Sequence, residues 1–279
     1  VAQDNGKIGF YAGTERRFLD HLEKQIYALY PDAEVRPKAD FTIYEPGDTV
    51  RGALLTLRRK HYLPLATYKE LEADPMQSLT GALAKIQQTD AAVIQFVCTA
   101  ASQRARRKGR RAARQTISGK RKDVGTRNPI FFKEADKLLQ TKKKDEPTDK
   151  LVYLTPGAQE RVQLVEAKLK EQQFAVTIRV GVAVRSPEEA ERVLNGMIAA
   201  FSQYDLPDLN SLKLVVPRQV KTFLRDLIFR LPNARYAATL STTELASLFH
   251  FPLPTTGTPN IEWRGARVAP MPPGLPQEG

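Results

Sequence analysis

The residues with the clearest chemical potential form a basic run between Arg104 and Lys122 that contains no acid. Its ten cationic side chains are Arg104, Arg106, Arg107, Lys108, Arg110, Arg111, Arg114, Lys120, Arg121 and Lys122. The whole chain has 43 basic and 31 acidic residues, so without these ten the balance is 33 against 31. The excess charge is therefore local. Such a block gains free energy when it meets phosphates or anionic lipid and releases counterions.

Two readings of the basic run stay open. If the run becomes helical, five cations share one face and are the first choice for phosphate contacts: Arg104, Arg107, Lys108, Arg111 and Arg114. Alternatively, the run is a solvated loop without a specific partner, because blocks of like charge are often disordered. No aromatic residue lies within it, and aromatic stacking usually accompanies grooves for single-stranded nucleic acid. Backbone contacts alone predict little base preference.

Other chemistry has little support in the sequence. The nearest match to a phosphate-binding P-loop is Ser118-Gly119-Lys120, but Arg121 follows it and Arg114 stands where the motif needs its first glycine. The three histidines are scattered without metal-ligand spacing. The single cysteine, Cys98, lies in an apolar run and is expected to be an inert buried thiol. We therefore expect no catalysis, no metal and no cofactor.

The first 103 residues have the element order β-α-β-β-α-β. Strands are expected at 7–12, 41–44, 53–57 and 91–98. A first helix ends before Pro31 and places Phe18, Leu22, Ile26 and Leu29 on one buried face, and Asp74-Pro75 starts a second helix. This order predicts a ferredoxin-like subdomain over residues 1–103, with two helices on one face of an antiparallel sheet.

The rest of the chain predicts a second α/β subdomain at 151–251, after a basic, flexible insertion at 104–150. A helix near 158–172 precedes a strand at 174–184, whose alternation predicts one core face and a less buried face with Arg179 and Arg185. Another helix, a strand at 212–216 and a further helix follow. Ser241 and Glu244 form a capping box. A proline-rich tail occupies 252–279, and the overall class is α+β.

Several segments resemble the region that precedes the motor domain in large ATPases of type IV secretion and conjugative DNA transfer, within the HerA and FtsK-like class. The segments that carry this resemblance are FYA at 10–12, YPDAE at 30–34, TYKELEADPMQSLTGALAKI at 67–86, AAVIQFV at 91–97, EAKLKEQQFAVTIRV at 166–180, LSTTELASLFHFP at 240–252, TPNIEW at 258–263 and APMPPGLP at 269–276. The resemblance implies a membrane anchor upstream and a nucleotide-binding motor downstream of the tail. The basic run is not a general feature of that family.

These observations lead to the hypothesis of a non-catalytic accessory region in a DNA-translocating ATPase. It would serve assembly and anchoring in the cytoplasm at the inner face of the membrane, as part of a homo-oligomer that meets other subunits or channel proteins. Its insertion would contact DNA or anionic lipid. The chain starts at Val1, which we interpret as the cut end of a longer protein, and no stretch reaches the about eighteen apolar residues of a membrane span. The alternatives are a pure protein-protein assembly module and a free-standing nucleic-acid-binding protein.

Overall fold

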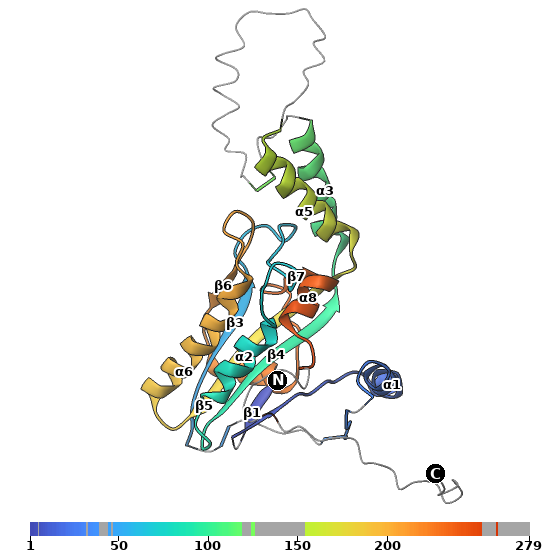
Figure 1. The fold of residues 1–279 in the computed structure, drawn as a ribbon. Helices are drawn as coiled ribbons and strands as arrows, with labels where there is room; N and C mark the ends of the chain where they lie inside the picture. The colour runs from blue at the N-terminus through green and yellow to red at the C-terminus, as the bar shows by residue number, and fades with distance from the viewer. Residues whose placement is uncertain are drawn as a thin grey trace, which may run out of the picture.

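The computed structural model shows an α+β fold in which helices pack around one antiparallel sheet (Figure 1). It describes residues 1–4, 6–31, 33–38, 44–45, 47–118, 124–125, 154–252 and 261. Within these ranges there are seven α-helices and a seven-stranded sheet. The predicted α+β class is confirmed.

The sheet combines strands from both ends of the chain. Its order is β2 (Lys7–Gly9), β1 (Ala2–Asp4), β4 (Ala91–Ala100), β5 (Gln173–Val184), β3 (Thr49–Leu57) and β6 (Leu212–Val215), and β7 (Ala238–Ser241) pairs with the start of β5. Adjacent strands run antiparallel. Because β5 lies between β3 and β4, the boundary expected near residue 103 does not divide the sheet.

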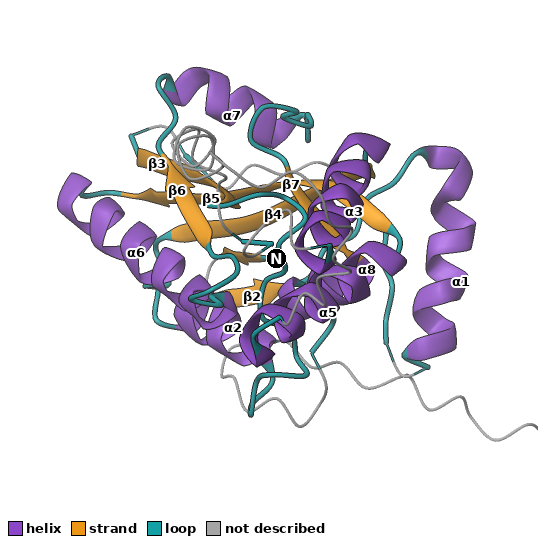
Figure 2. Ribbon diagram, turned by 90° about the horizontal axis from the view of Figure 1, so that it is seen from above, coloured by secondary structure: helices purple, strands orange, loops and turns teal. Residues whose placement is uncertain are grey.

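Helices cover the two faces of the sheet unequally. On one face, α2 (Pro75–Ala84), α6 (Pro187–Ala199), the 3-10 helix η2 (Ala200–Tyr204) and α8 (Thr242–Leu248) enclose the main core. The predicted caps form here, since Asp74 accepts from the Met76 N–H and Ser241 and Glu244 close a capping box. On the other face lies α7 (Val220–Ile228), as the view from above shows (Figure 2).

The prediction of a less buried second face is wrong for Arg179, because α7 covers that face of β5, whereas Arg185, just beyond the strand, is exposed. The Phe223 ring lies over Gly52 and Gly181, and a Cβ added at Gly52 would come within 2.2 Å of the ring. The Arg179 side chain, 1% exposed, donates from Nη1 to Gln95 Oε1 at 2.9 Å and from Nη2 to the Leu231 carbonyl. Arg179 therefore holds the segment after α7 on the sheet.

The helix α1 (Leu19–Leu29), preceded by the 3-10 turn η1 (Arg16–Phe18), corrects another expectation. Its predicted apolar face is not buried: Leu29 is 75% exposed and Phe18 is also exposed. The helix stands away from the sheet in both ribbon views (Figures 1 and 2). At its end, Tyr30 makes an edge-on contact with Phe251 at 5.6 Å. The predicted helix is present, but no described helix or strand buries its apolar face.

Two helices, α3 (Gln103–Ile117) and α5 (Pro156–Lys170), form a hairpin that projects beyond the ends of β4 and β7 (Figure 1). A separate apolar cluster joins the hairpin to the loop at Tyr62 and Leu63. Of the predicted strand at 41–44, residues 41–43 lie outside the described residues. No helix within the described ranges is both long and apolar enough to cross a membrane.

Candidate functional site: a cationic face on the α3–α5 hairpin

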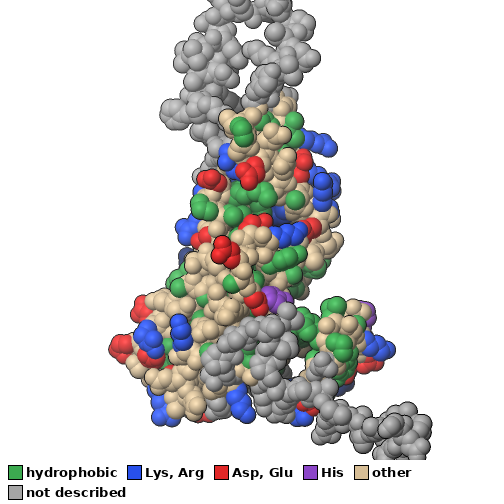
Figure 3. Space-filling view, viewed as in Figure 1, with side chains coloured by type: hydrophobic (Ala, Val, Ile, Leu, Met, Phe, Trp, Pro, Cys, Tyr) green, Lys and Arg blue, Asp and Glu red, His purple; other side chains and the backbone are tan. Residues whose placement is uncertain are grey.

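The predicted helical alternative holds for Gln103–Ile117, and it separates cations from small residues on two faces of α3. Six cations are exposed on what we call the outer face: Arg104, Arg107, Lys108, Arg110, Arg111 and Arg114. Lys and Arg side chains line one side of the projecting hairpin in Figure 3. The outer face thus includes all five residues that the helical spacing placed together.

The inner face of α3 consists of small residues that allow close packing on α5. Gly109, Ala112, Ala113 and Thr116 are buried there. A Cβ added at Gly109 would lie 2.7 Å from Tyr62 Cβ and 2.9 Å from the methyl groups of Leu169. Because such distances are shorter than normal van der Waals contact, only glycine permits this approach of α3 to its neighbours. Packing therefore holds α3 in place and fixes the direction of its outer face.

Arg106 differs from the other cations in the first turns of α3. It is half-buried, and its Nε donates to the Leu169 carbonyl at 2.8 Å while an Nη donates to the Lys170 carbonyl at 3.4 Å. These are carbonyls at the C-terminal end of α5, where a cation is favourable for the helix dipole. Arg106 was predicted to bind phosphate, but its guanidinium contacts the protein itself.

Ion pairs between the outer face and acids are absent within the described ranges. Among the described residues, no acid forms an ion pair with any of its six cations. Arg107 has like charges three and four residues later, at Arg110 and Arg111. Each such pair destabilises a helix by about 0.2–0.5 kcal/mol. Repulsion between the outer-face cations therefore lowers the stability of α3, and a bound polyanion would remove this repulsion.

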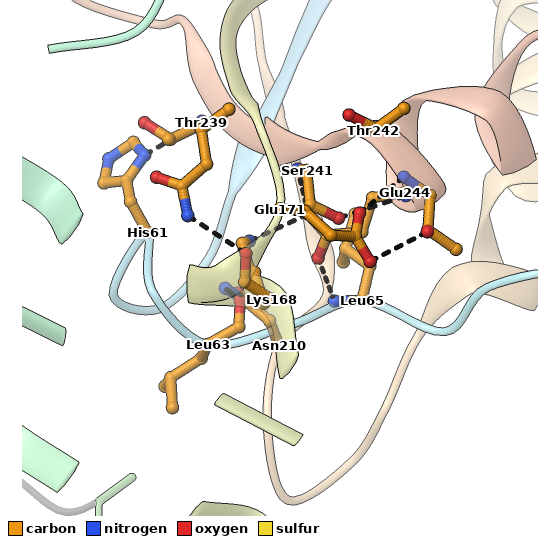
Figure 4. Close-up of polar contacts among 12 residues, drawn as sticks. His61, Leu63, Leu65, Lys168, Glu171, Asn210, Thr239, Ser241, Thr242 and Glu244 are labelled. Atoms are coloured by element: carbon orange, nitrogen blue, oxygen red, sulfur yellow. Dashed lines mark hydrogen bonds and ion pairs between the residues drawn. The ribbon is translucent and has the colours of Figure 1, made fainter. Parts of the chain in front are cut away.

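A buried ion pair fixes α5, and with it the hairpin, to the body of the molecule (Figure 4). Lys168 Nζ lies 3.0 Å from Glu244 Oε2, and both side chains are 1% exposed. The Lys168 ammonium also donates to the Leu63 carbonyl at 3.2 Å. Glu244 accepts from the Leu65 N–H and the Ser241 N–H, each at 2.8 Å. The pair is therefore surrounded by hydrogen bonds, as a buried pair requires.

The same region shifts two pKa values. Burial lowers the pKa of Lys168, against the opposing effect of the Glu244 carboxylate. Burial also lowers the pKa of His61, and the positive charges of Lys168 and Lys108 lower it further. His61 Nδ1 accepts from the Thr239 N–H at 3.2 Å. His61 is thus a neutral acceptor at the base of the hairpin.

The sequence reasoning missed two polar residues of the outer face. Gln115 and Ser118 line an open surface hollow together with Arg107, Arg110, Arg111 and Arg114. Their spacing in the sequence indicated this position, because Gln115 stands four residues after Arg111 and Ser118 stands four residues after Arg114. The remaining predicted site residues, Lys120, Arg121 and Lys122, lie outside the described residues.

The remaining residues considered for chemistry are the potential metal ligands and Cys98. No group of three or more His, Cys, Asp or Glu side chains suited to a metal ion occurs within the part of the chain that the structure describes. Cys98 is exposed, so the expectation of a buried thiol is wrong. It lies near the end of β4, where the apolar run reaches solvent.

The fold and site together define an α+β domain that carries a projecting, cationic helical hairpin. The chain belongs to the family described as a domain of unknown function (DUF8128), whose model matches residues 1–264. Comparison with the curated proteins and with the solved structures found no match for this chain.

Proposed function

We propose that this chain binds the phosphate backbone of nucleic acid through the outer face of α3. One observation carries the proposal: six exposed cations share one face of a helix that tertiary packing holds in a fixed direction. Five of the six are arginines, whose planar guanidinium groups match phosphate oxygens in a bidentate geometry. A fixed array also loses less conformational entropy on binding than a mobile loop does.

The packing of α3 favours a phosphate polymer over a lipid surface. A helix that binds a membrane surface inserts an apolar face into the acyl boundary beside its cationic face. In α3 the inner face has only small residues, and α5 already covers Ala112, Ala113 and Thr116. Apart from Ile117 at its last position, α3 therefore offers charge without an exposed large apolar side chain. Anionic lipid becomes an outcome of the test below.

The wider role follows from the resemblance to the region ahead of the motor in DNA-translocating ATPases of type IV secretion. In that role the chain is a non-catalytic accessory region at the cytoplasmic face of the membrane, within a homo-oligomer. The α3 hairpin would guide DNA toward the motor. Beyond the resemblance, this role is supported by the position of the hairpin, which projects away from the sheet (Figure 1).

We also propose a ferredoxin-like unit, placed at residues 49–215 instead of 1–103. Its support is the element order β3, α2, β4, β5, α6 and β6, in which the strand order β6-β3-β5-β4 is antiparallel throughout. The helices α2 and α6 contact each other over the same core. This is the split β-α-β arrangement. The α3–α5 hairpin then stands between the second and third strands of the unit.

A second candidate function is protein-protein assembly, which the apolar side chains of α1 favour. Phe18, Leu19 and Leu29 are exposed within twelve residues of the chain. An isolated helix of this length is marginal in water, and an amphipathic helix normally gains its stability by packing. Assembly through α1 is compatible with nucleic-acid binding through α3, because α3 belongs to the projecting hairpin and α1 lies toward the opposite end of the molecule (Figure 1).

The test measures binding of DNA and of anionic vesicles across a salt series. The variant R107Q/R110Q/R111Q/R114Q removes four outer-face cations, and the control K85Q/K213Q/R218Q/K221Q removes four exposed cations elsewhere. We expect the slope of log K against log salt to decrease in magnitude by about 3–4 in the first variant alone. If both variants lose binding equally, net charge is responsible and the site is wrong. If only vesicles bind, the partner is a membrane.

A further inference from the structure

We infer that the outer face of α3 docks into the major groove of duplex nucleic acid, with cations on its two flanks contacting the phosphates of the two strands. This inference rests on the proposed function. It concerns the shape of the ligand, which the arrangement of cations around the helix axis restricts. Three observations carry it: the angular spread of the cations, the position of polar residues between them, and the side of α3 that α5 covers.

The cations extend too far around α3 for a single row of phosphates. Successive residues of an α-helix are about 100° apart. Relative to Arg111, this places Arg110 at about −100° and Arg114 at about −60°, whereas Arg104 lies at about +20° and Lys108 at about +60°. The outer face therefore spans about 160°. A single backbone or a flat surface would contact the middle of this arc and leave its edges unused.

A groove with phosphates on both sides fits this arc. The major groove of B-DNA is about 12 Å wide, and an α-helix with its side chains is about 10–12 Å across. One wall would meet Arg110 and Arg114, and the other would meet Arg104 and Lys108. From Arg104 to Arg114 the helix rises about 15 Å. Along that distance a duplex carries about nine phosphates on its two strands, which is enough for every flank cation.

The centre of the arc has the side chains that a groove floor accommodates. Arg111 lies there with Gln115 and Ser118, and these line the surface hollow with the neighbouring arginines. Arginine and glutamine are hydrogen-bonding partners of purine edges in the major groove. No aromatic residue occurs in α3, so the helix has no stacking platform for the unpaired bases of a single strand.

Among the described residues, those that pack against α3 contact its inner face and leave the outer face open to a duplex. The buried residues Gly109, Ala112, Ala113 and Thr116 face α5 and lie opposite Arg111 on the helix. Arg106, at about −140° from Arg111, is already turned toward the end of α5. Arg106, which lies outside the arc of the outer face, is thus the arginine that hydrogen-bonds to the protein itself.

The experiment compares a duplex of about 20 base pairs, one of its single strands and anionic vesicles, with the full chain at about 0.15 M salt. Competitors are methyl green, which occupies the major groove, and netropsin, which occupies the minor groove. We expect the duplex to bind more tightly than the single strand, with displacement by methyl green alone. The flank variants R110Q/R114Q and R104Q/K108Q should each weaken duplex binding roughly 30-fold, from about 5-fold for each lost phosphate contact. The variant K85Q/K221Q is the control with the same loss of charge.

The outcomes separate this inference from the proposed function. Equal affinity for duplex and single strand, with both reduced by the flank variants, overturns groove docking and leaves phosphate binding by α3 in place. Displacement by netropsin also overturns major-groove docking alone. If only one flank variant weakens duplex binding, a single row of phosphates is bound and the two-sided geometry is wrong. If the duplex does not bind, or binds equally well to the flank variants and their control, both the inference and the proposed function fail.

Discussion

Cations occur in two contrasting environments on the same hairpin. Lys168 on α5 is buried, faces Glu244 at 3.0 Å and donates to a backbone carbonyl. The cations of the outer face of α3 are exposed and form no ion pair with a described acid. A buried charge is retained only with its partners, whereas an exposed like-charge array makes the helix less stable. The contrast separates Lys168, whose contacts stabilise the fold, from the exposed outer-face cations, which we propose bind a ligand.

The largest expected effect follows from removing the buried cation. Lys168→Met leaves the Glu244 carboxylate buried without its partner, which typically costs about 3–5 kcal/mol. Urea unfolding measures this loss. The double variant K168M/E244Q should recover part of it, because no unpaired charge then remains. A loss below about 1 kcal/mol in Lys168→Met would show that the ion pair does not hold the hairpin.

A smaller loss of unfolding free energy is expected when a methyl group is added where α3 packs against its neighbours. Gly109→Ala places a methyl group 2.7 Å from Tyr62 Cβ, so the helix must shift, and overpacking of this kind costs about 1–3 kcal/mol. The matched control is Gly196→Ala in α6, where nothing lies within 4 Å of the new methyl group. The control should gain up to about 1 kcal/mol from helix propensity. Equal unfolding free energies for the two variants would contradict the close packing of α3.

The acidic residue next to the buried pair gives a pH dependence. Burial would raise the pKa of Glu171, but hydrogen bonds from the Thr243 N–H and hydroxyl, both at 2.8 Å, lower it below its ordinary value of 4.5. A carboxylate whose pKa is lowered by folding stabilises the protein above pH 4.5, and this contribution disappears as the pH falls through the lowered pKa.

Glu171→Gln should therefore lose about 1 kcal/mol near neutral pH and respond less to acid than the parent chain. Unfolding in urea at several pH values between 7 and 3 measures both effects. A parallel pH profile for parent and variant would show that Glu171 does not contribute in this way.

The smallest effect on stability is expected for the outer face. Replacing Arg107, Arg110, Arg111 and Arg114 by glutamine removes like-charge repulsion without loss of packing, and helix propensity changes little. We expect the unfolding free energy to stay within about 0.5 kcal/mol or to rise slightly. Thermal and urea unfolding would measure it. A loss above about 1 kcal/mol would mean that these arginines hold the fold, and the contrast with Lys168 would disappear.

Local signals in the sequence predicted much of this molecule. The Asp74 cap, the capping box of Ser241 and Glu244 and the helical spacing of the outer-face arginines each depend on residues within a few positions. Such patterns report local geometry directly. The cationic face was accordingly predicted by residue type and spacing alone.

What the sequence could not predict depends on contacts between distant segments. The second buried face of β5 depends on α7, and the exposed apolar side of α1 depends on the lack of a cover among the described elements. Lys168 lies beside the apolar stripe of α5, but its partner Glu244 belongs to a different helix far along the chain. For the same reason Arg106 could not be separated from the other arginines, since its acceptors are in α5.

The most direct test measures two quantities on one pair of variants. Duplex affinity and unfolding free energy are determined for R107Q/R110Q/R111Q/R114Q and for its charge-matched control K85Q/K213Q/R218Q/K221Q, at the same salt concentration. We predict that only the first variant loses affinity, by roughly two to three orders of magnitude, while both keep their stability. Equal affinities for the two variants, or a loss of affinity that accompanies unfolding, would contradict a ligand-binding face on α3.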